Sequence, residues 1–565
     1  MGKWSIYSSL PLKYRRRGYL VSFTIFLRAL LNFAGLAALL PVLYLILDAS
    51  NIHSNPILEY IYRCFSFTST QTFIIVISIS ILLFIIFKNL LNLFLYRFER
   101  DYIYALFRYL SRNMFIDYFN RGLPFIKKNN SAVLSRNVNV VCYTFVAGVL
   151  RPVASILSET MLFILLIASI IAYSPMAALL SILVFAPVSW IYIGLYKNHV
   201  NTLGKEENEA HRQKYRDVIE TYRGYQDIET NNAFPGMLSS FDKALTTIIR
   251  TGKKNAVIGN IPQILTEVGL TLGMIVLIMV ATYQNSMNAK ILFGVFAVAA
   301  LRLLPSLKTI LSAWTSIKYN RYTLDIISEA SLKEEITPES TTEERVDFKH
   351  SIKTCDLCFR FDDSNRDTIH KLNIEIRKGE RVGITGKSGA GKTTLFNLLL
   401  GMYQPSSGEI LIDGERLTPL TKRKWQNTIG YVSQNVFLQD TSIVENIALG
   451  VKSENIDRKR AQKAIEMSSL LAFVEKLPKG MDSKIGECGA LLSGGERQRI
   501  GIARALYKNA DVLFFDEATS SLDSETEQSI NASIEHLSKN NSELTIVVIA
   551  HRETSLACCQ RIIRL

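Results

Sequence analysis

Six long runs of apolar residues, all within about the first 320 positions, constrain this chain more than any other feature. Each run is close to the roughly 20 residues that an α-helix needs to cross the hydrocarbon core of a bilayer. We therefore expect an all-α membrane domain with six spanning helices, which returns the chain to the side on which it began. The predicted spans are 19–47, 72–97, 144–173, 176–197, 258–284 and 290–316.

The segments between these spans are very unequal in length. Spans three and four are joined by the short sequence AYSPM, whereas 98–143 and 198–257 are long, polar and compatible with helix. Both long segments are rich in Lys and Arg, and basic segments of this kind stay on the cytoplasmic side. We expect the membrane helices to continue into the cytoplasm as stalks; separate cytoplasmic helical subdomains are the alternative.

The net charge of +14, from 64 basic and 50 acidic residues, could suggest nucleic acid as a partner. However, the basic residues of the first half cluster at the ends of the apolar runs, and no basic stripe with interleaved aromatic residues is present. The charge therefore fits membrane orientation, and we expect no nucleic-acid partner.

The cysteines do not form a disulfide framework, because there are seven of them at irregular spacing. Cys355 and Cys358 form a CxxC motif, but it lies in a strand-like run where a spacing of three places the two thiols on opposite faces. A zinc site there would need a second pair of ligands. We expect both cysteines to be structural.

A composition change divides the chain. Residues 326–345 are acidic, contain Pro338 and lack apolar periodicity, which predicts a linker. It separates a membrane domain, 1–325, from a domain of ordinary soluble composition, 346–565.

The second domain contains a phosphate-binding loop in the sequence ERVGITGKSGAGKTT, which reads as a strand, a glycine-rich turn and a helix. The glycines let backbone N–H groups close around phosphate oxygens, and the helix N-terminus adds its dipole. Lys392 would supply a charge for the β- and γ-phosphates and Thr393 a hydroxyl for Mg²⁺. This predicts an α/β P-loop fold that binds ATP and Mg²⁺ through Gly386, Lys387, Ser388, Gly389, Ala390, Gly391, Lys392, Thr393 and Thr394.

Four further polar side chains follow strand-like apolar runs, and functional groups of parallel sheets lie just past the carboxyl ends of strands. After DVLFF, Asp516 would hold the Mg²⁺ shell and Glu517 would act as general base for the attacking water. His551 could bind the γ-phosphate, and the Gln434 amide could meet both Mg²⁺ and the attacking water. A solvated acidic turn and a structural histidine are the alternatives, but the P-loop in the same chain favours the catalytic interpretation.

From about Val346 onward the chain resembles the nucleotide-binding domain of ABC transporters. The turn LSGGE looks like the family's signature motif, and SSLD at 520–523 also occurs in family order and spacing. In that family the signature turn of one subunit closes over the nucleotide held by the P-loop of another. With one P-loop and one signature per chain, the resemblance implies a homodimer that binds two ATP molecules. It also implies nucleotide contacts for Ser493, Gly494, Gly495, Glu496 and Asp523.

Other features carried by the resemblance are less complete. Phe361 matches the aromatic residue that stacks on adenine, which is usually tyrosine, and Cys488 replaces the usual arginine beside the acidic Glu487. The sequence ends at CCQRIIRL, where family members normally add a strand and a tail. The presence of Glu517 and His551 implies ATP hydrolysis, and hence a pump and not an ATP-gated channel. A DNA-repair ATPase of the same superfamily would need a long coiled coil in the interval of about a hundred residues between P-loop and signature.

The membrane domain resembles that of exporter-type ABC transporters. The resemblance implies an integral protein of the bacterial inner membrane, with its nucleotide-binding domain in the cytoplasm. It also implies short transverse helices that dock on the nucleotide domains, for which 130–141 and 221–232 are candidates.

Two cations suggest the substrate. Lys88 and Arg302 interrupt apolar runs, and each costs roughly 2.5–3.5 kcal/mol at the centre of a membrane helix. The surrounding FKNLLN and LRLLPS look similar to bacterial lipid-linked oligosaccharide flippases. We therefore hypothesise that both cations contact an anionic lipid headgroup; a peptide or multidrug exporter is the alternative. Pairing among the other intramembrane charges is the structural explanation for Arg28, Arg151, Glu159 and Glu267.

Overall fold

The computed structural model describes the chain over 10–38, 56–64, 69–173, 175–284, 287–330, 344–362, 364–517, 542–550 and 559–565, with single residues or pairs at 527–528, 532, 535 and 556–557. Within the helices, several side chains, including all of 280–302, lie outside the described set. The chain forms two compact units, Met1–Thr337 and Pro338–Leu565.

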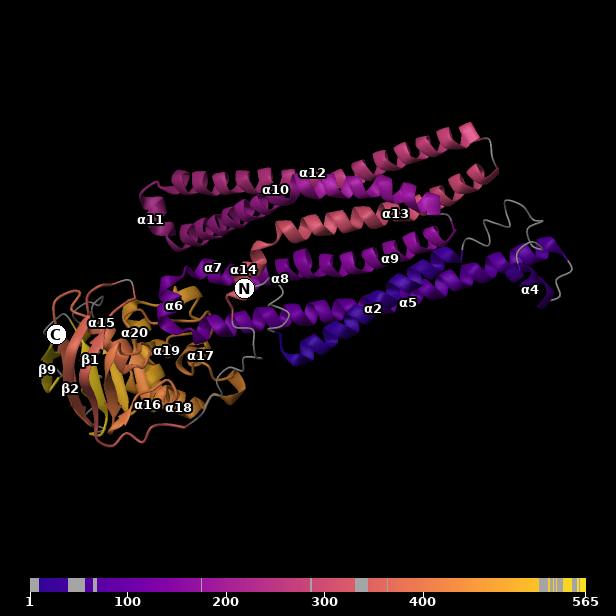
Figure 1. Cartoon of the computed structure of the whole chain (residues 1–565). Helices are drawn as coiled ribbons and strands as arrows, with labels where there is room; N and C mark the ends of the chain where they lie inside the picture. Colours follow the sequence, from indigo (N-terminus) through magenta and orange to yellow (C-terminus); the bar gives the residue numbers. More distant parts are fainter. Residues whose placement is uncertain are drawn as a thin grey trace. The chain divides into compact units, whose positions relative to one another are not determined.

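The first unit is built of long helices (Figure 1). α5, α10 and α12 have 51, 49 and 51 residues. At 1.5 Å per residue each is about 75 Å long, more than twice the roughly 30 Å of a bilayer core. The polar segments after spans two and four are thus continuous with the span helices, as predicted. The long helices of this unit are α2 (Leu12–Ala37), α5 (Thr70–Asn120), α9 (Arg151–Tyr173), α10 (Pro175–Arg223), α12 (Phe234–Gln284) and α13 (Met287–Tyr319), with a short α4 (Pro56–Cys64).

All six predicted spans coincide with helices where they are described. Three stretches are long and apolar enough to cross a membrane when the described residues are considered: Leu12–Ala37, Gln71–Asn120 and Ser131–Ala172. The other three predicted spans lie on α10, α12 and α13. The end of the first predicted span, 39–47, lies outside the described residues.

The two predicted docking helices differ in outcome. α11 (Tyr225–Thr230) is a separate short helix between α10 and α12, within the predicted 221–232. The prediction for 130–141 is wrong, because this segment opens a continuous helical run to Tyr173. The break comes earlier, at Asn129, where the backbone is extended and Asn130 Oδ1 accepts a hydrogen bond from the Ala132 N–H at 2.8 Å. The elements here are α6 (Gly122–Lys128), α7 (Ser131–Arg136), the π-helical η2 (Asn137–Val141), α8 (Cys142–Phe145) and the π-helical η3 (Val146–Leu150).

Two larger apolar clusters and a small one between α2 and α9 pack the described part of the membrane unit. One of the larger clusters joins α9, α10, α12 and α13 around Tyr192, whose hydroxyl donates to Ile258 O at 3.0 Å and lies 2.7 Å from the Thr315 hydroxyl. The other joins α5, α8 and α14 (Tyr322–Ser328) and buries Ile327 and Ala330. The predicted linker 326–345 therefore begins with residues that belong to the packed membrane unit, and 331–343 lie outside the described residues.

The second unit contains an antiparallel and a parallel sheet. The antiparallel sheet has the order β2-β1-β4-β5 and the parallel sheet the order β6-β7-β8-β3-β9. Every residue of β7 and β8 is buried, as expected of central strands covered on both faces. The predicted architecture, a helical membrane region followed by an α/β P-loop domain, is confirmed. The strands are β1 (Ser351–Phe359), β2 (Ile369–Arg377), β3 (Arg381–Thr385), β4 (Ser407–Ile412), β5 (Glu415–Arg416), β6 (Ile429–Val432), β7 (Val512–Asp516), β8 (Thr545–Ile549) and β9 (Arg561–Arg564).

Short helices connect these strands (Figure 1). α15 follows β3 and packs against β7, and α20 packs against β6. The helices are α15 (Lys392–Leu399), α16 (Lys422–Thr428), α17 (Ile443–Ile447), α18 (Arg458–Met467), α19 (Leu471–Val474) and α20 (Gly494–Tyr507).

Candidate functional site

The glycine-rich loop between β3 and α15 has the conformation that its sequence predicts. Gly389 and Gly391 have φ of 83° and 90°, in the region that favours glycine. A Cβ on Gly391 would lie 2.8 Å from Ile369 Cδ1 and 3.0 Å from Thr368 O, so the loop approaches β2 too closely for a larger residue. Lys392 is buried, and its Nζ donates to Gly386 O at 2.9 Å and Lys387 O at 3.2 Å. The ammonium thus lies inside the loop.

The strand order places the other predicted groups at the same sheet edge. β6, β7, β8 and β3 are adjacent and parallel, so their carboxyl ends carry Gln434, Asp516 and the P-loop side by side. Gln434 Nε2 donates to Glu517 Oε2 at 3.2 Å, and the Glu517 N–H donates to Ile549 O at 3.0 Å. Glu517 has a φ of 49°, an uncommon conformation outside glycine that is typical of functional sites. The structure therefore brings Gln434, Asp516 and Glu517 together.

Asp516 is the buried carboxylate of this edge, with 5% of its surface exposed. The Tyr431 hydroxyl, one strand away, donates to its Oδ2 at 3.2 Å. Burial and the neighbouring carboxylate raise the pKa of Tyr431 well above its ordinary value, so this tyrosine stays a neutral donor. Tyr431 was not predicted as a site residue, since its strand reads only as apolar.

The signature turn begins helix α20. The Ser493 hydroxyl accepts from the Glu496 N–H at 3.3 Å and the Ser493 N–H donates to Glu496 Oε2 at 2.7 Å, which is a complete capping box. Ser493 and Gly494 are exposed. Within the described part of the chain, no hydrogen bond joins this turn to the P-loop.

Two side chains of α20, the buried Gln498 and the half-buried Arg504, reach the segment that carries Gln434. Gln498, 3% exposed, donates through Nε2 to Gln434 O at 2.7 Å. Arg504 donates to Asn446 O and Phe437 O, each at 2.9 Å, and burial lowers the pKa of its guanidinium to about 10. Both residues were missed in the sequence analysis. The available signal was a polar side chain at Gln498 on the inward face of a helix.

The remaining predicted nucleotide contacts are only partly described. Phe361 is 42% exposed and makes edge-to-face contacts with Phe359 and Tyr403, at centroid distances of 4.9 and 5.9 Å. The ring of Phe361 thus packs against two other aromatic rings while part of its surface remains open to solvent. His551 and Asp523 lie outside the described residues.

Of the two cations predicted to contact the substrate, the structure describes the side chain of Lys88 only. Lys88 of α5 lies across Gly35 of α2, since a Cβ on that glycine would be 2.8 Å from Lys88 Cδ. Its side chain therefore crosses the contact between these two helices. Arg302 lies on α13, but its side chain is outside the described set.

The other intramembrane charges find different partners from those expected. Arg28 pairs with Glu99 of α5 at 2.6 Å. Glu159 accepts from the Ser306 hydroxyl at 2.7 Å, and Glu267 accepts from the Gln263 amide at 2.9 Å. In the described part of the chain, neither Arg28 nor Arg151 pairs with Glu159 or Glu267. The prediction that these four charges pair with one another is therefore wrong there.

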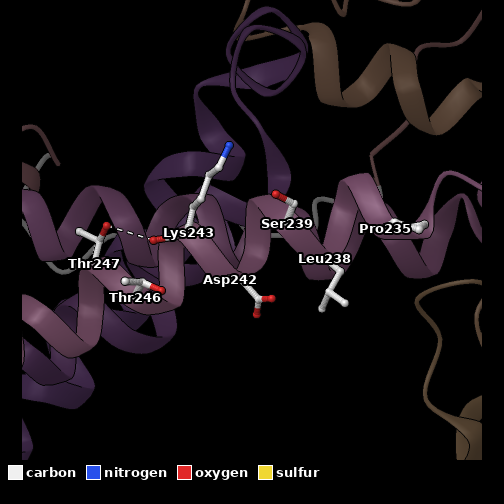
Figure 2. Close-up of a pocket in the computed structure, with 7 residues that line it drawn as sticks. All are labelled: Pro235, Leu238, Ser239, Asp242, Lys243, Thr246 and Thr247. Atoms are coloured by element: carbon white, nitrogen blue, oxygen red, sulfur yellow. Dashed lines mark hydrogen bonds between the residues drawn. The ribbon is translucent and has the colours of Figure 1, made fainter.

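A surface hollow of about 590 Å³ lies along α12, near its start. Figure 2 shows the lining side chains, among them Pro235, Asp242 and Lys243, and the hydrogen bond of 3.0 Å from the Thr247 hydroxyl to Lys243 O. Ligand sites usually have polar groups that converge from several elements. The described residues that line this hollow all come from α12, so they do not converge in this way. This hollow is not the nucleotide site.

The chain is similar to known proteins in both sequence and fold. A family model described as ABC transporter matches residues 369–520. The ATP-dependent lipid A-core flippase of Ralstonia nicotianae is 29% identical over 459 residues, covering 80% of this chain and 76% of the relative. The protein of the same description from Bordetella pertussis is 30% identical over 423 residues, covering 74% and 67%. A solved bacterial Atm1-family ABC exporter with ATP bound shares the fold, with a TM-score of 0.76, 21% identity and coverage of 98% and 93%.

Long apolar helices joined to a P-loop unit with an acidic strand end and a signature helix define a membrane transporter driven by ATP hydrolysis. The chain belongs to the ABC transporter family and has the domain order of an exporter half-transporter. Its second unit is the domain of the transporter that hydrolyses ATP.

Proposed function

We propose that two copies of this chain form an ATP-driven flippase that moves an amphipathic lipid across the bacterial inner membrane. The observation that carries this proposal is the length of the match to relatives named lipid A-core flippases. A match of 459 residues is longer than the whole of Pro338–Leu565, so it includes the membrane unit. Similarity in the unit that contacts the substrate supports a lipid cargo.

For the cargo we propose a lipid-linked oligosaccharide, whose pyrophosphate is an anion that needs compensation away from bulk water. Lys88 lies at the contact of α2 and α5, and Arg302 lies on α13. Both would contribute cations to the path of the headgroup. The cost of placing a charge in a membrane helix supports a functional role for each.

In the nucleotide site, we propose that Lys392 exchanges its bonds to Gly386 O and Lys387 O for the β- and γ-phosphates of ATP. The Thr393 hydroxyl, the Gln434 amide and the Asp516 carboxylate supply oxygen ligands, the type that Mg²⁺ prefers. The bound ion would neutralise charge that develops on the phosphates. Phe361 would stack on adenine.

Glu517 would accept the proton of the attacking water, and its bond to Gln434 orients the carboxylate. His551 would bind the γ-phosphate. The exposed Ser493 and the N-terminus of α20 would close the same site from a second, identical subunit.

The test is steady-state ATPase activity of the full chain in nanodiscs, with Glu517→Gln as the blank. The lipids to add are a polyprenyl-pyrophosphate oligosaccharide, a lipid A-core preparation and a neutral glycolipid. We expect several-fold stimulation by the first that is lost in Arg302→Ala. Stimulation by the lipid A-core preparation alone would contradict the proposed headgroup, and stimulation only by peptides or uncharged drugs would contradict a lipid cargo.

A further inference from the structure

Three metal-ligating side chains of different types meet beside the P-loop. The atoms are Cys358 Sγ at the end of β1, a carboxylate oxygen of Asp367 and a ring nitrogen of His370 in β2, all within 4.8 Å of one another. In the described part of the chain this is the one group of His, Cys, Asp and Glu so placed. We propose that these three residues bind a zinc ion.

A bulge in the sheet creates this arrangement. Leu357 pairs with Leu372 and Phe359 pairs with Ile369. The chain therefore advances two residues along β1 while it advances three along β2. The extra residue is accommodated at Lys371, which has a φ of 43°. A bulge re-aims side chains, and here it brings His370 to the same side as Cys358.

The connection between the two strands adds the third ligand. The Thr368 N–H donates to Phe359 O at 2.8 Å, which closes the loop and returns Asp367 to the end of β1. The CxxC motif alone would need a second pair of ligands near Cys358 to hold zinc. The fold supplies that pair from β2 and the residues before it, and Cys355 is not part of the group.

The donor set fits zinc better than a hard cation. A thiolate and an imidazole together favour Zn²⁺, whereas Mg²⁺ and Ca²⁺ prefer oxygen ligands alone. The Lys371 N–H donates to Cys358 Sγ at 3.2 Å, so the backbone of β2 holds this sulfur in place. Three protein ligands leave the fourth position of a tetrahedral ion for water.

The geometry needs only a small adjustment. Ligand atoms around tetrahedral zinc lie roughly 3.3–3.8 Å apart, given bonds of about 2.0–2.3 Å. Atoms that lie up to 4.8 Å apart must therefore approach by about 1.5 Å at most. His370 and Asp367 can do so, because their side chains are 72% and 35% exposed and already lie 3.4 Å apart as a pair. Cys358 is buried and supplies the fixed ligand.

The three ligands lie next to two segments that are proposed to contact ATP, the one that carries Phe361 and the P-loop. Phe359, next to Cys358, makes the edge-to-face contact with the ring of Phe361. Thr368 and Ile369, between the other two ligands, are the residues against which Gly391 of the P-loop packs. Zinc would tie these segments together and stiffen the site for ATP. This coupling rests on the proposed nucleotide contacts, whereas metal binding itself does not.

Metal binding is tested on the full chain in detergent, stripped of metal and titrated with Zn²⁺ against a chelating dye, and separately with Co²⁺. We expect one high-affinity Zn²⁺ per chain and a thiolate-to-cobalt charge-transfer band. Cys358→Ser and His370→Ala should weaken Zn²⁺ binding at least tenfold, and Cys355→Ser, on the same strand, should leave it unchanged. Asp367→Asn, at an exposed position, covers the case in which Cys358→Ser does not fold.

Unchanged Zn²⁺ affinity in Cys358→Ser, or a cobalt band that persists in it, would overturn the site. If Cys358→Ser does not fold, unchanged affinity in Asp367→Asn would overturn it. Coupling is read from the KM for ATP, with one equivalent of Zn²⁺ and without. We expect zinc to lower it several-fold in the wild type and in Cys355→Ser but not in Cys358→Ser. Zinc binding with an unchanged KM would overturn the coupling alone. Absence of ATPase activity in the zinc-free wild type would instead count against the proposed nucleotide site.

Discussion

Gly391 and Gly389 allow a matched test of the P-loop at the scale of one residue. Both have positive φ, which costs an L-residue about 1–2 kcal/mol. Only Gly391 is also crowded, by Ile369 and Thr368, whereas a Cβ on Gly389 meets nothing within 4 Å. We expect Gly391→Ala to weaken ATP binding more than tenfold and Gly389→Ala only a few-fold. Titration with a fluorescent ATP analogue measures both, and equal losses would show that close approach to β2 is unimportant.

Lys508 gives the second unit a pH dependence. Burial, with a smaller effect of Arg345, lowers the pKa of this lysine from 10.5 to about 8, although its Nζ donates to Ile429 O at 2.9 Å. Because the pKa is lower in the folded state, the unfolded chain binds more protons between pH 8 and 10.5. The stability contribution of Lys508 therefore rises with pH across that window.

Lys508→Met keeps an apolar stem and removes the titration. We expect the thermal unfolding midpoint of the wild type to rise relative to that of the variant between pH of about 8 and 10.5, since the protonated buried lysine destabilises the fold. Comparison at each pH cancels the titration of other groups. A constant difference between the two proteins would mean that Lys508 is not buried as a cation.

At the scale of elements, two capping boxes separate stability from function. Ser442 with Glu445 begins α17, and Ser493 with Glu496 begins α20. Loss of a cap by Ser→Ala costs about 1 kcal/mol at either helix. We expect similar shifts in the unfolding midpoint for Ser442→Ala and Ser493→Ala, but a large loss of ATPase activity only for Ser493→Ala. Equal loss of activity would place the effect of Ser493 in folding.

Elements with long uniform patterns could be predicted from the sequence. β7 and β8 are apolar except for Asp516 and Thr545, because both faces of these strands are covered. The stalk helices follow from long polar segments that contain few breaking residues. The continuation of 130–141 into the helical run to Tyr173 was missed, because the bounds of this docking helix came from the resemblance and not from a stop signal in the sequence. The bulge at Lys371 and the bond from Gln498 to Gln434 arise from pairing between distant segments. No local pattern encodes such contacts.

At the scale of the whole molecule, the proposed closure of each nucleotide site by a second subunit predicts complementation between subunits. A Lys392→Ala chain retains its signature helix, and a Ser493→Arg chain retains its P-loop. If the turn of one chain closes over the P-loop of another, a mixed pair contains one intact composite site, because the intact P-loop then faces the intact signature.

Each variant alone should lack ATPase activity. Mixed pairs, isolated through two different affinity tags, should regain up to about half of the wild-type activity if the two sites act independently. If the sites are coupled, a mixed pair should still occlude one non-hydrolysable ATP analogue where neither parent occludes any. A double variant carrying both changes in one chain, paired with itself, is the control, since it offers no intact composite site. Failure of the mixed pair to occlude nucleotide would mean that each chain completes its own site, and the homodimer would then have no role in hydrolysis.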